Sequence, residues 1–196
     1  MRIAGVLLAA GESARLGEPK QLLDAGGVPL IRRLADEIVA VCDDCAVVLG
    51  ARATDMIAPL ARLRATLVVN WEWEEGMGSS VRVAADFARS HVADGVLVAV
   101  CDQPALDRAH LGALIDAFSA AGGTAAVGSA YTGTVGVPAV FPARLFATLA
   151  ALTGDQGARR VLRDDPDTRS IPWPAGALDL DTPEQVRDWY LRSQSR

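Results

Sequence analysis

The stretch LLAAGESARLGEPKQLL begins in an apolar run and continues into a loop with small residues and two cations. Arg15 and Lys20 supply the positive charge. Small side chains let a ligand approach the backbone closely, and successive N–H groups can hold an anion. The stretch therefore predicts a phosphate-binding loop, although its spacing matches neither a P-loop nor a GxGxxG motif, and a solvated glycine turn is the alternative. The small residues expected to contact a nucleotide are Ala9, Ala10 and Gly11.

Two acidic residues have the character of magnesium ligands. Asp102 ends the apolar run GVLVAVC, and Asp181 lies in DLDTPEQ. Magnesium is typically held by one or two carboxylates together with substrate phosphates and water, so Asp102 and Asp181 are predicted to share one Mg²⁺. Each residue also has a plainer interpretation. Asp102 can form a turn before a proline, and Asp181 can be a charge favoured by the N-terminus of the last helix.

A third candidate segment is NWEWEEGMGSSVR, in which Ser79 and Ser80 stand at the start of a predicted helix that continues toward Phe87. Hydroxyl groups at a helix N-terminus can bind ligand oxygens or cap the helix, and both roles are considered for these serines. Trp71 and Trp73 follow a predicted strand and are interpreted as closing the edge of a core.

Apolar runs of strand length alternate with segments whose apolar residues have helical spacing. The alternation predicts an α/β fold, a doubly wound and mostly parallel sheet with helices on both faces, of Rossmann-like type. In such folds ligands bind beyond the carboxyl ends of the strands, where the loop after the first run and Asp102 both lie. The predicted strands are IAGVLLAA, AVVLG, ATLVV, GVLVAVC, TAAVG and GVPAVF.

The pattern continues without a linker or repeat, so residues 1–196 are predicted to form a single domain. A terminal helix is expected to begin at Pro183, with Thr182 as its N-cap and Gln185 completing a capping box. The net charge of -5 disfavours nucleic acid as a partner, and no apolar run approaches the roughly 20 residues of a membrane-spanning helix. A cytoplasmic location is expected.

Taken together, these motifs resemble a known enzyme family. LAAGESARLGEPKQLL is similar to the signature LAAGxSxRMGxPKxLL of nucleotidyltransferases related to molybdopterin-guanine dinucleotide synthase. GMGSSVR resembles GMSSSLR, and DQPAL, GVPAVF, GDQGAR and DLDTPEQ follow in the order found in molybdenum cofactor cytidylyltransferases. The resemblance covers nearly the whole chain.

The resemblance implies that CMP is transferred from CTP to molybdopterin, with pyrophosphate as the second product. Ala10 favours cytosine, because guanylyl-transferring relatives tend to have glycine there. By the same resemblance Arg15, Lys20 and Asp102 are the catalytic residues, Mg²⁺ is the cofactor, and the acceptor is bound by Pro138 and Arg159. The alternative interpretation of Arg159 is that it is a surface charge with no role in binding the acceptor. A recipient molybdoenzyme or its chaperone is the expected transient partner.

The chain departs from the family pattern at Leu16, where methionine is usual, and at Gly78, which replaces the first serine of GMSSS. The absence of that hydroxyl is expected to leave room for a different base or ribose contact. Three other functions are considered: another small-molecule nucleotidyltransferase, a nucleotide sensor, and an NAD(P)-dependent oxidoreductase of the nicotine blue type. Against the last of these, this sequence lacks the glycine fingerprint that is usual for binding a nicotinamide cofactor.

Overall fold

The computed structural model describes residues 1–193, and its seven strands pair into one sheet in the order β3-β2-β1-β4-β6-β5-β7. Four of the six pairings are parallel, namely β1 with β2, β1 with β4, β2 with β3, and β5 with β7. Only β6 runs antiparallel to its neighbours β4 and β5 in this part of the chain. The strands are β1 (Ile3–Ala9), β2 (Asp44–Leu49), β3 (Thr66–Val69), β4 (Gly95–Val100), β5 (Val127–Tyr131), β6 (Thr134–Pro142) and β7 (Arg169–Pro172).

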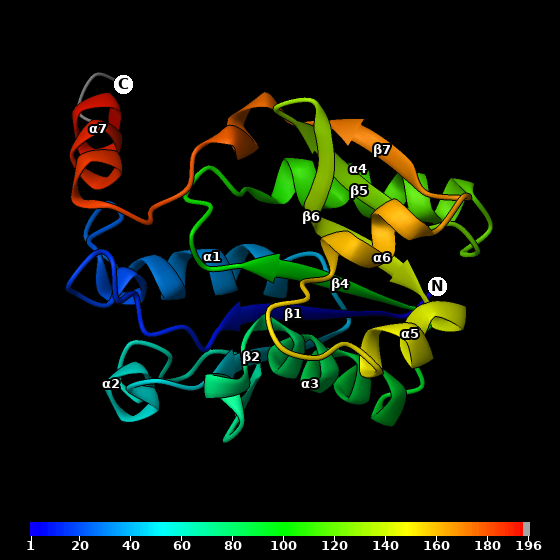
Figure 1. Cartoon of the computed structure of the whole chain (residues 1–196), viewed down its shortest axis with the longest axis horizontal. Helices are drawn as coiled ribbons and strands as arrows, with labels where there is room; N and C mark the ends of the chain where they lie inside the picture. The colour runs from blue at the N-terminus through cyan, green and yellow to red at the C-terminus, as the bar shows by residue number, and fades with distance from the viewer. Residues whose placement is uncertain (194–196) are drawn as a thin grey trace.

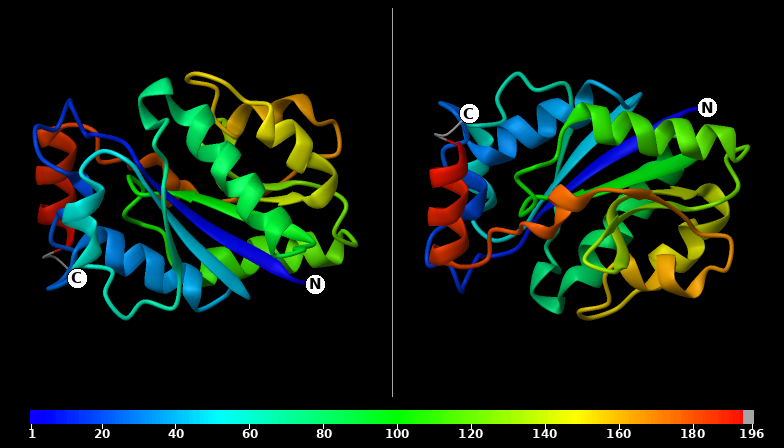
Figure 2. Two further views of the ribbon diagram at one scale, coloured as in Figure 1. Left: turned by 90° about the horizontal axis from the view of Figure 1, so that it is seen from below. Right: turned by 90° about the horizontal axis from the view of Figure 1, so that it is seen from above.

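Helices cover both faces of this sheet, as the two opposite views in Figure 2 show. One face is packed by α1 (Leu30–Val39) and α4 (Arg108–Ala120), and the other by α3 (Met77–Ser90), α5 (Phe146–Ala150) and α6 (Arg159–Asp164). The expected doubly wound, mostly parallel α/β fold is thereby confirmed. The remaining α-helices of the described chain are α2 (Ala53–Ile57) and α7 (Pro183–Ser193).

The first strand explains why the apolar runs are nearly continuous. Ile3 and Leu7 enter the hydrophobic cluster beneath α1 and α4, whereas Val6 and Leu8 enter the cluster beneath α3. Successive side chains of a strand point to opposite faces, and both faces of this sheet are covered. An alternating pattern of apolar and polar residues would have left one of these two cores unfilled.

The prediction of the sheet was incomplete on one side. β7 was not among the predicted strands, and the GVPAVF run lies in the antiparallel β6 rather than in a parallel strand. β7 has the sequence RSIP, with four residues that are half-buried or exposed, so it lacks the apolar run by which the other strands were recognised. Residues 194–196 of the predicted domain lie outside the described part of the chain.

The fold brings distant segments together at the carboxyl ends of β1 and β4. β1 lies between β2 and β4, so the strands that follow β1 and β4 continue toward opposite edges of the sheet, and a doubly wound fold forms its crevice where the strand order diverges in this way. Figure 1 shows α7 beyond these strand ends, beside the loop that follows β1. No helix among residues 1–193 is both long and apolar enough to span a membrane.

Candidate functional site

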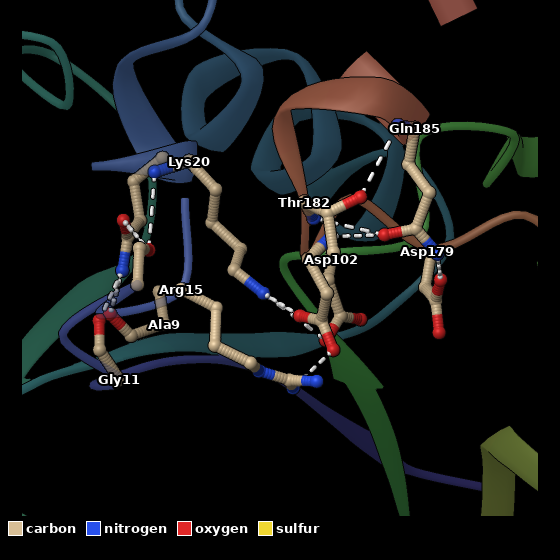
Figure 3. A network of polar contacts seen from close by, with 11 residues as sticks. Ala9, Gly11, Arg15, Lys20, Asp102, Asp179, Thr182 and Gln185 are labelled. Atoms are coloured by element: carbon tan, nitrogen blue, oxygen red, sulfur yellow. Dashed lines mark hydrogen bonds and ion pairs between the residues drawn. The ribbon is translucent and has the colours of Figure 1, made fainter. Parts of the chain in front are cut away.

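Four charged side chains meet at the carboxyl ends of β1 and β4. The Lys20 ammonium lies 2.5 Å from Asp181 and 3.6 Å from Asp102, and the Arg15 guanidinium lies 2.6 Å from Asp181. Figure 3 shows Lys20 and Arg15 both reaching from the loop toward Asp102. The structure thus brings together the two predicted phosphate-binding cations and the two predicted metal ligands.

These residues line a cavity of about 380 Å³ that also contains the small residues of the loop. Lys20 is 14% exposed, whereas Arg15 is 74% exposed, so the lysine is the cation held inside the site. Ala10 itself is buried, and its carbonyl accepts a hydrogen bond from the N–H of Ala51. The residues of the prediction that line this cavity are Ala9, Gly11, Arg15, Lys20, Asp102 and Asp181.

The loop is held by a glutamine that sequence reasoning did not single out. Gln21 is buried, and its amide donates to the carbonyls of Ala9 and Gly11 at 2.9 and 2.8 Å (Figure 3). The hydroxyl of Ser13 accepts from the N–H of Lys20. Gln21 therefore ties the segment that carries Lys20 back to the end of β1. The only feature of the sequence that could have indicated this role of Gln21 is its position next to Lys20.

Asp181 is positioned by the start of α7. The side chain of Gln185 accepts hydrogen bonds from the N–H groups of Asp181 and Thr182, and Thr182 accepts from the N–H of Gln185 (Figure 3). This arrangement confirms the predicted capping box. The N–H of Leu180 donates to the carbonyl of Asp102 at 2.9 Å, so the two predicted metal ligands are also joined through the backbone.

The two carboxyl groups differ in their electrostatics. Burial raises the pKa of Asp102, and the nearby Lys20 opposes this rise. Burial also disfavours ionisation of Asp181, but the hydrogen bond and charge of Lys20, with those of Arg15, outweigh it and lower the pKa. The larger stabilisation of the charged form is thus at Asp181, which touches both cations.

The donor set fits a magnesium ion. Asp102 and Asp181 both have a carboxylate oxygen within 3.6 Å of the Lys20 ammonium, so the two carboxylates lie close enough together to share one cation. No group of three or more His, Cys, Asp or Glu side chains suited to a metal occurs in residues 1–193. Two protein carboxylates with ligands from the substrate are what magnesium usually requires.

Ser79 and Ser80 are buried at the start of α3 and both accept hydrogen bonds from the amide of Asn70, at 2.8 and 3.1 Å. The suggestion that one of them caps α3 was wrong, since the N-cap is Gly76 and no side chain caps it. Ser79 instead donates to the carbonyl of Gly76. Their contact with a nucleotide stays a prediction. Trp73 packs against the core, but Trp71 is 87% exposed and does not close an edge as expected.

Gly78 does not leave room for a new ligand contact. A Cβ at this position would lie 2.9 Å from the backbone of Thr153, and the N–H of Gly78 donates to the carbonyl of Gly154. The loop is held there by Arg82, which donates to the carbonyl of Leu152. The backbone of residues 153–154 therefore occupies the space that a side chain at position 78 would fill, and the expectation that Gly78 leaves room for a base or ribose contact was wrong.

The predicted acceptor residues lie on the β6 and α6 side of the molecule. Pro138 is buried, and its carbonyl accepts a hydrogen bond from Ser129 at 2.6 Å. Arg159 is exposed and donates to the hydroxyl of Thr134. Arg159 lines a separate cavity of about 830 Å³. Burial raises the pKa of Tyr131, and the hydrogen bond from Gln103 and the charge of Arg159 oppose this rise.

The chain is similar to known proteins over most of its length. Residues 5–169 match the model of the MobA-like NTP transferase domain. The chain is 37% identical to the nicotine blue oxidoreductase of Paenarthrobacter nicotinovorans, over 94% of each protein. It is 33% identical to the purine catabolism protein PucB of Bacillus subtilis, over 98% of each.

Among solved structures, the chain is similar to Rv0371c from Mycobacterium tuberculosis, with 31% identity and a TM-score of 0.81. The alignment covers 96% of this chain and 97% of that one. A crystal structure of Rv0371c in complex with manganese is also similar, with 30% identity and a TM-score of 0.77 over the same shares of the two chains.

Proposed function

Since the chain belongs to the MobA-like NTP transferase family and is a nucleotidyltransferase, we propose that it transfers CMP from CTP to molybdopterin. The products are molybdopterin cytosine dinucleotide and pyrophosphate. The observation that carries the proposal is the convergence of Arg15, Lys20, Asp102 and Asp181 on one cavity at the strand ends. Two cations suit a triphosphate, and two carboxylates suit the metal that accompanies it.

In this proposal the loop after β1 holds the triphosphate. Lys20 and Arg15 now pair with Asp181, so the phosphates compete with that carboxylate for both cations. Lys20 is the less exposed of the two and neutralises the charge that develops on the departing pyrophosphate. Gln21 keeps Ala9 and Gly11 in place while this charge forms.

Asp102 and Asp181 would hold Mg²⁺, which when bound supplies Lewis-acid stabilisation of the phosphate oxygens. The Rv0371c structure with manganese supports a divalent cation in a similar protein. The terminal phosphate of molybdopterin attacks the α-phosphorus of CTP. A new P–O bond forms there as the bond to the bridging oxygen of the β-phosphate breaks. No general base is needed, because a phosphate monoester with a second pKa of about 6 is largely ionised near neutral pH.

In this proposal the acceptor binds on the side of β6 and α6, where Pro138 and Arg159 lie. Arg159 is exposed and has only the hydroxyl of Thr134 as a hydrogen-bond partner in the described structure, which leaves its charge for an acceptor phosphate or pterin oxygen. Pro138 is buried, and in this proposal it supports the acceptor side by fixing the backbone of β6, where its carbonyl accepts the hydrogen bond from Ser129. Ser79 and Ser80, at the start of α3, would contact the nucleotide.

The preference for CTP rests on the alanine at position 10, where guanylyl-transferring relatives tend to have glycine. We expect a higher kcat/KM for CTP than for GTP when both compete for the protein with magnesium and molybdopterin present. A higher kcat/KM for GTP would instead assign the protein to the guanylyl-transferring members of the family. The reaction would take place in the cytoplasm, and the product would pass to a recipient molybdoenzyme or its chaperone.

A second candidate follows from the relative named nicotine blue oxidoreductase. It would be an NAD(P)-dependent reduction of an aromatic pigment. Anaerobic incubation of the pure protein with nicotine blue and NADH or NADPH tests it by the loss of nicotinamide absorbance. Catalysed oxidation of the nicotinamide, without dinucleotide formation from CTP and molybdopterin, would favour this candidate.

A further inference from the structure

A second cavity, of about 800 Å³, lies beside α7 and shares no lining residue with the cavity around Lys20 and Asp102. Its volume falls within the range of about 300–1,000 Å³ that is usual for small-molecule sites. The wall is formed by α1, α7, the loop that follows Asp102 and the short 3-10 helix Pro174–Ala177. It includes Arg33, Pro104, Ala175, Trp189, Tyr190 and Arg192.

Arg33 is a half-buried cation of this wall whose charge is not paired with an acid. Its guanidinium donates to the backbone carbonyls of Pro104 and Leu106, the latter at 3.2 Å. It forms no ion pair among residues 1–193, and Glu37, whose charge acts on it, is itself bound to Arg108 at 2.9 Å. Burial lowers the pKa of Arg33. A guanidinium has five N–H donors, so donors remain for an anion in the cavity.

The charges around the cavity favour an anionic ligand. Arg33 and Arg192 are its cations, and Asp24 is the acid of its lining. Asp24 is exposed and accepts a hydrogen bond from the N–H of Gly27 at 2.8 Å. Taking a charge out of water is unfavourable unless an opposite charge compensates it, and Arg33 is the more buried of the two cations. An anion placed against Arg33 supplies that compensation.

The aromatic part of the wall favours a flat ring. Trp189 and Tyr190 are half-buried neighbours on α7, with ring centroids 4.9 Å apart and planes tilted by 32°. Pro104, Pro174 and Leu178 add apolar surface to the same cavity. Aromatic side chains bind other rings through their large apolar area and through stacked or edge-on contacts.

We infer that this cavity is a second ligand site, which binds a planar aromatic molecule that carries an oxyanion group such as a carboxylate. The ring lies against Trp189 and Tyr190, and the anionic group accepts hydrogen bonds from Arg33. The inference goes beyond the proposed function and does not depend on it, because the nucleotide and its metal are placed in the other cavity.

A matched set of small molecules tests the ligand class. The probe is 2-naphthoate, a flat carboxylate, titrated calorimetrically into the pure protein at low ionic strength. The wild type should bind it at one site. It should bind 2-naphthylmethanol, which lacks the charge, and cyclohexanecarboxylate, which lacks the flat ring, about tenfold or more weakly. No binding of 2-naphthoate, or equally tight binding of either control compound, overturns the inference.

Variants of the wall locate the bound probe. Arg33→Met should weaken the binding of 2-naphthoate about tenfold or more, and Arg33→Lys should weaken it less, because the lysine keeps the charge. Ala175→Trp fills the cavity from an exposed position, leaves Arg33 in place and should abolish binding. Ala147→Trp, at an exposed alanine of α5 outside this cavity, is the control and should bind as the wild type does.

Wild-type affinity in folded Ala175→Trp, or an equal loss in Ala147→Trp, overturns the inference. Equal loss in Arg33→Met and Arg33→Lys, with both folded, also overturns it, because support of the loop rather than charge would then explain the effect. A melting temperature for each variant shows that folded proteins are compared. If Arg33→Met does not fold, Ala175→Trp decides.

Competition with CTP separates this site from the nucleotide cavity. The wild type should bind 2-naphthoate with the same stoichiometry when CTP and magnesium are present. Displacement of the probe by CTP overturns the inference of a separate site. If CTP and molybdopterin give no dinucleotide, the proposed function fails, whereas the binding of 2-naphthoate still decides this inference.

Discussion

Replacing Lys20 by methionine removes one charge from the centre of the site and leaves most of the buried stem in place. The ammonium lies 2.5 Å from Asp181 and 3.6 Å from Asp102, and the side chain is 14% exposed. Lys20→Met therefore leaves two carboxylates facing each other without the cation between them. Loss of a charge-assisted hydrogen bond at such a site costs on the order of 1–3 kcal/mol, and the desolvation of the ammonium that is relieved offsets part of it.

In a protein of this size about 1–2 kcal/mol corresponds to a decrease of roughly 2–8 °C in melting temperature. The effect on turnover should be much larger, because Lys20 is proposed to neutralise charge that develops during transfer. A donor of this kind is worth about 10²- to 10³-fold in rate. Lys20→Met should thus remain folded at 25 °C while its kcat falls by two to three orders of magnitude.

Arg15→Met is the matched control. Arg15 also contacts Asp181, but its side chain is 74% exposed, so solvent screens its charge and we expect a loss of about tenfold or less. The assay is pyrophosphate release with CTP, magnesium and molybdopterin, together with a thermal melt of each variant. Wild-type turnover in folded Lys20→Met, or a larger loss in Arg15→Met, would refute the reasoning.

Three further predictions concern neighbouring elements. Asp102→Asn and Asp181→Asn should each abolish most activity and the double variant should be little worse, whereas defects that multiply would contradict a shared metal. Gly78→Ser puts a Cβ 2.9 Å from the backbone of Thr153 and should lower the melting temperature by an amount corresponding to about 1–3 kcal/mol. Gly112→Ser is the control, because a Cβ there has nothing within 4 Å, and it should not lower the melting temperature. Equal melting temperatures of the two variants would contradict the steric argument. The hydrogen bond from the Arg82 guanidinium is the main cause that lowers the pKa of Glu75 to about 2, so the stabilising effect of Glu75 should be present above about pH 4.5 and fade toward pH 2. The melting temperatures of Glu75→Gln and the wild type should therefore differ most at neutral pH. A difference that grows as the pH falls would show the opposite linkage.

The sequence predicted the central part of the sheet and the residues at its edge for the same physical reason. Near-continuous apolar runs identify strands buried on both faces, and the residue that ends such a run must lie at the rim. Asp102 was located in this way, and Arg15 and Lys20 followed from the loop after β1. The capping box at Thr182 was also local, since its partners are three residues apart.

Residues whose partners lie far along the chain could not be found in this way. Gln103 pairs with Val137, 34 residues away, and only the folded hairpin shows which end of its amide is unpaired. The space beside Gly78 is likewise occupied by the backbone of residues 153–154, which no local pattern indicates. β7 is too short and too polar to resemble a buried strand, and its place follows from pairing with β5.

The most direct test of the proposed activity follows the two ends of the CTP triphosphate separately. Pure protein is incubated with magnesium, molybdopterin and CTP labelled at either the α- or the γ-phosphorus, and the products are separated by chromatography. The proposed reaction places the α-label in molybdopterin cytosine dinucleotide and the γ-label in pyrophosphate, in equal amounts, with both products lost in Lys20→Met. Release of the γ-label as inorganic phosphate, or an α-label that stays in free CMP or CTP while molybdopterin is unchanged, would contradict nucleotidyl transfer to this acceptor.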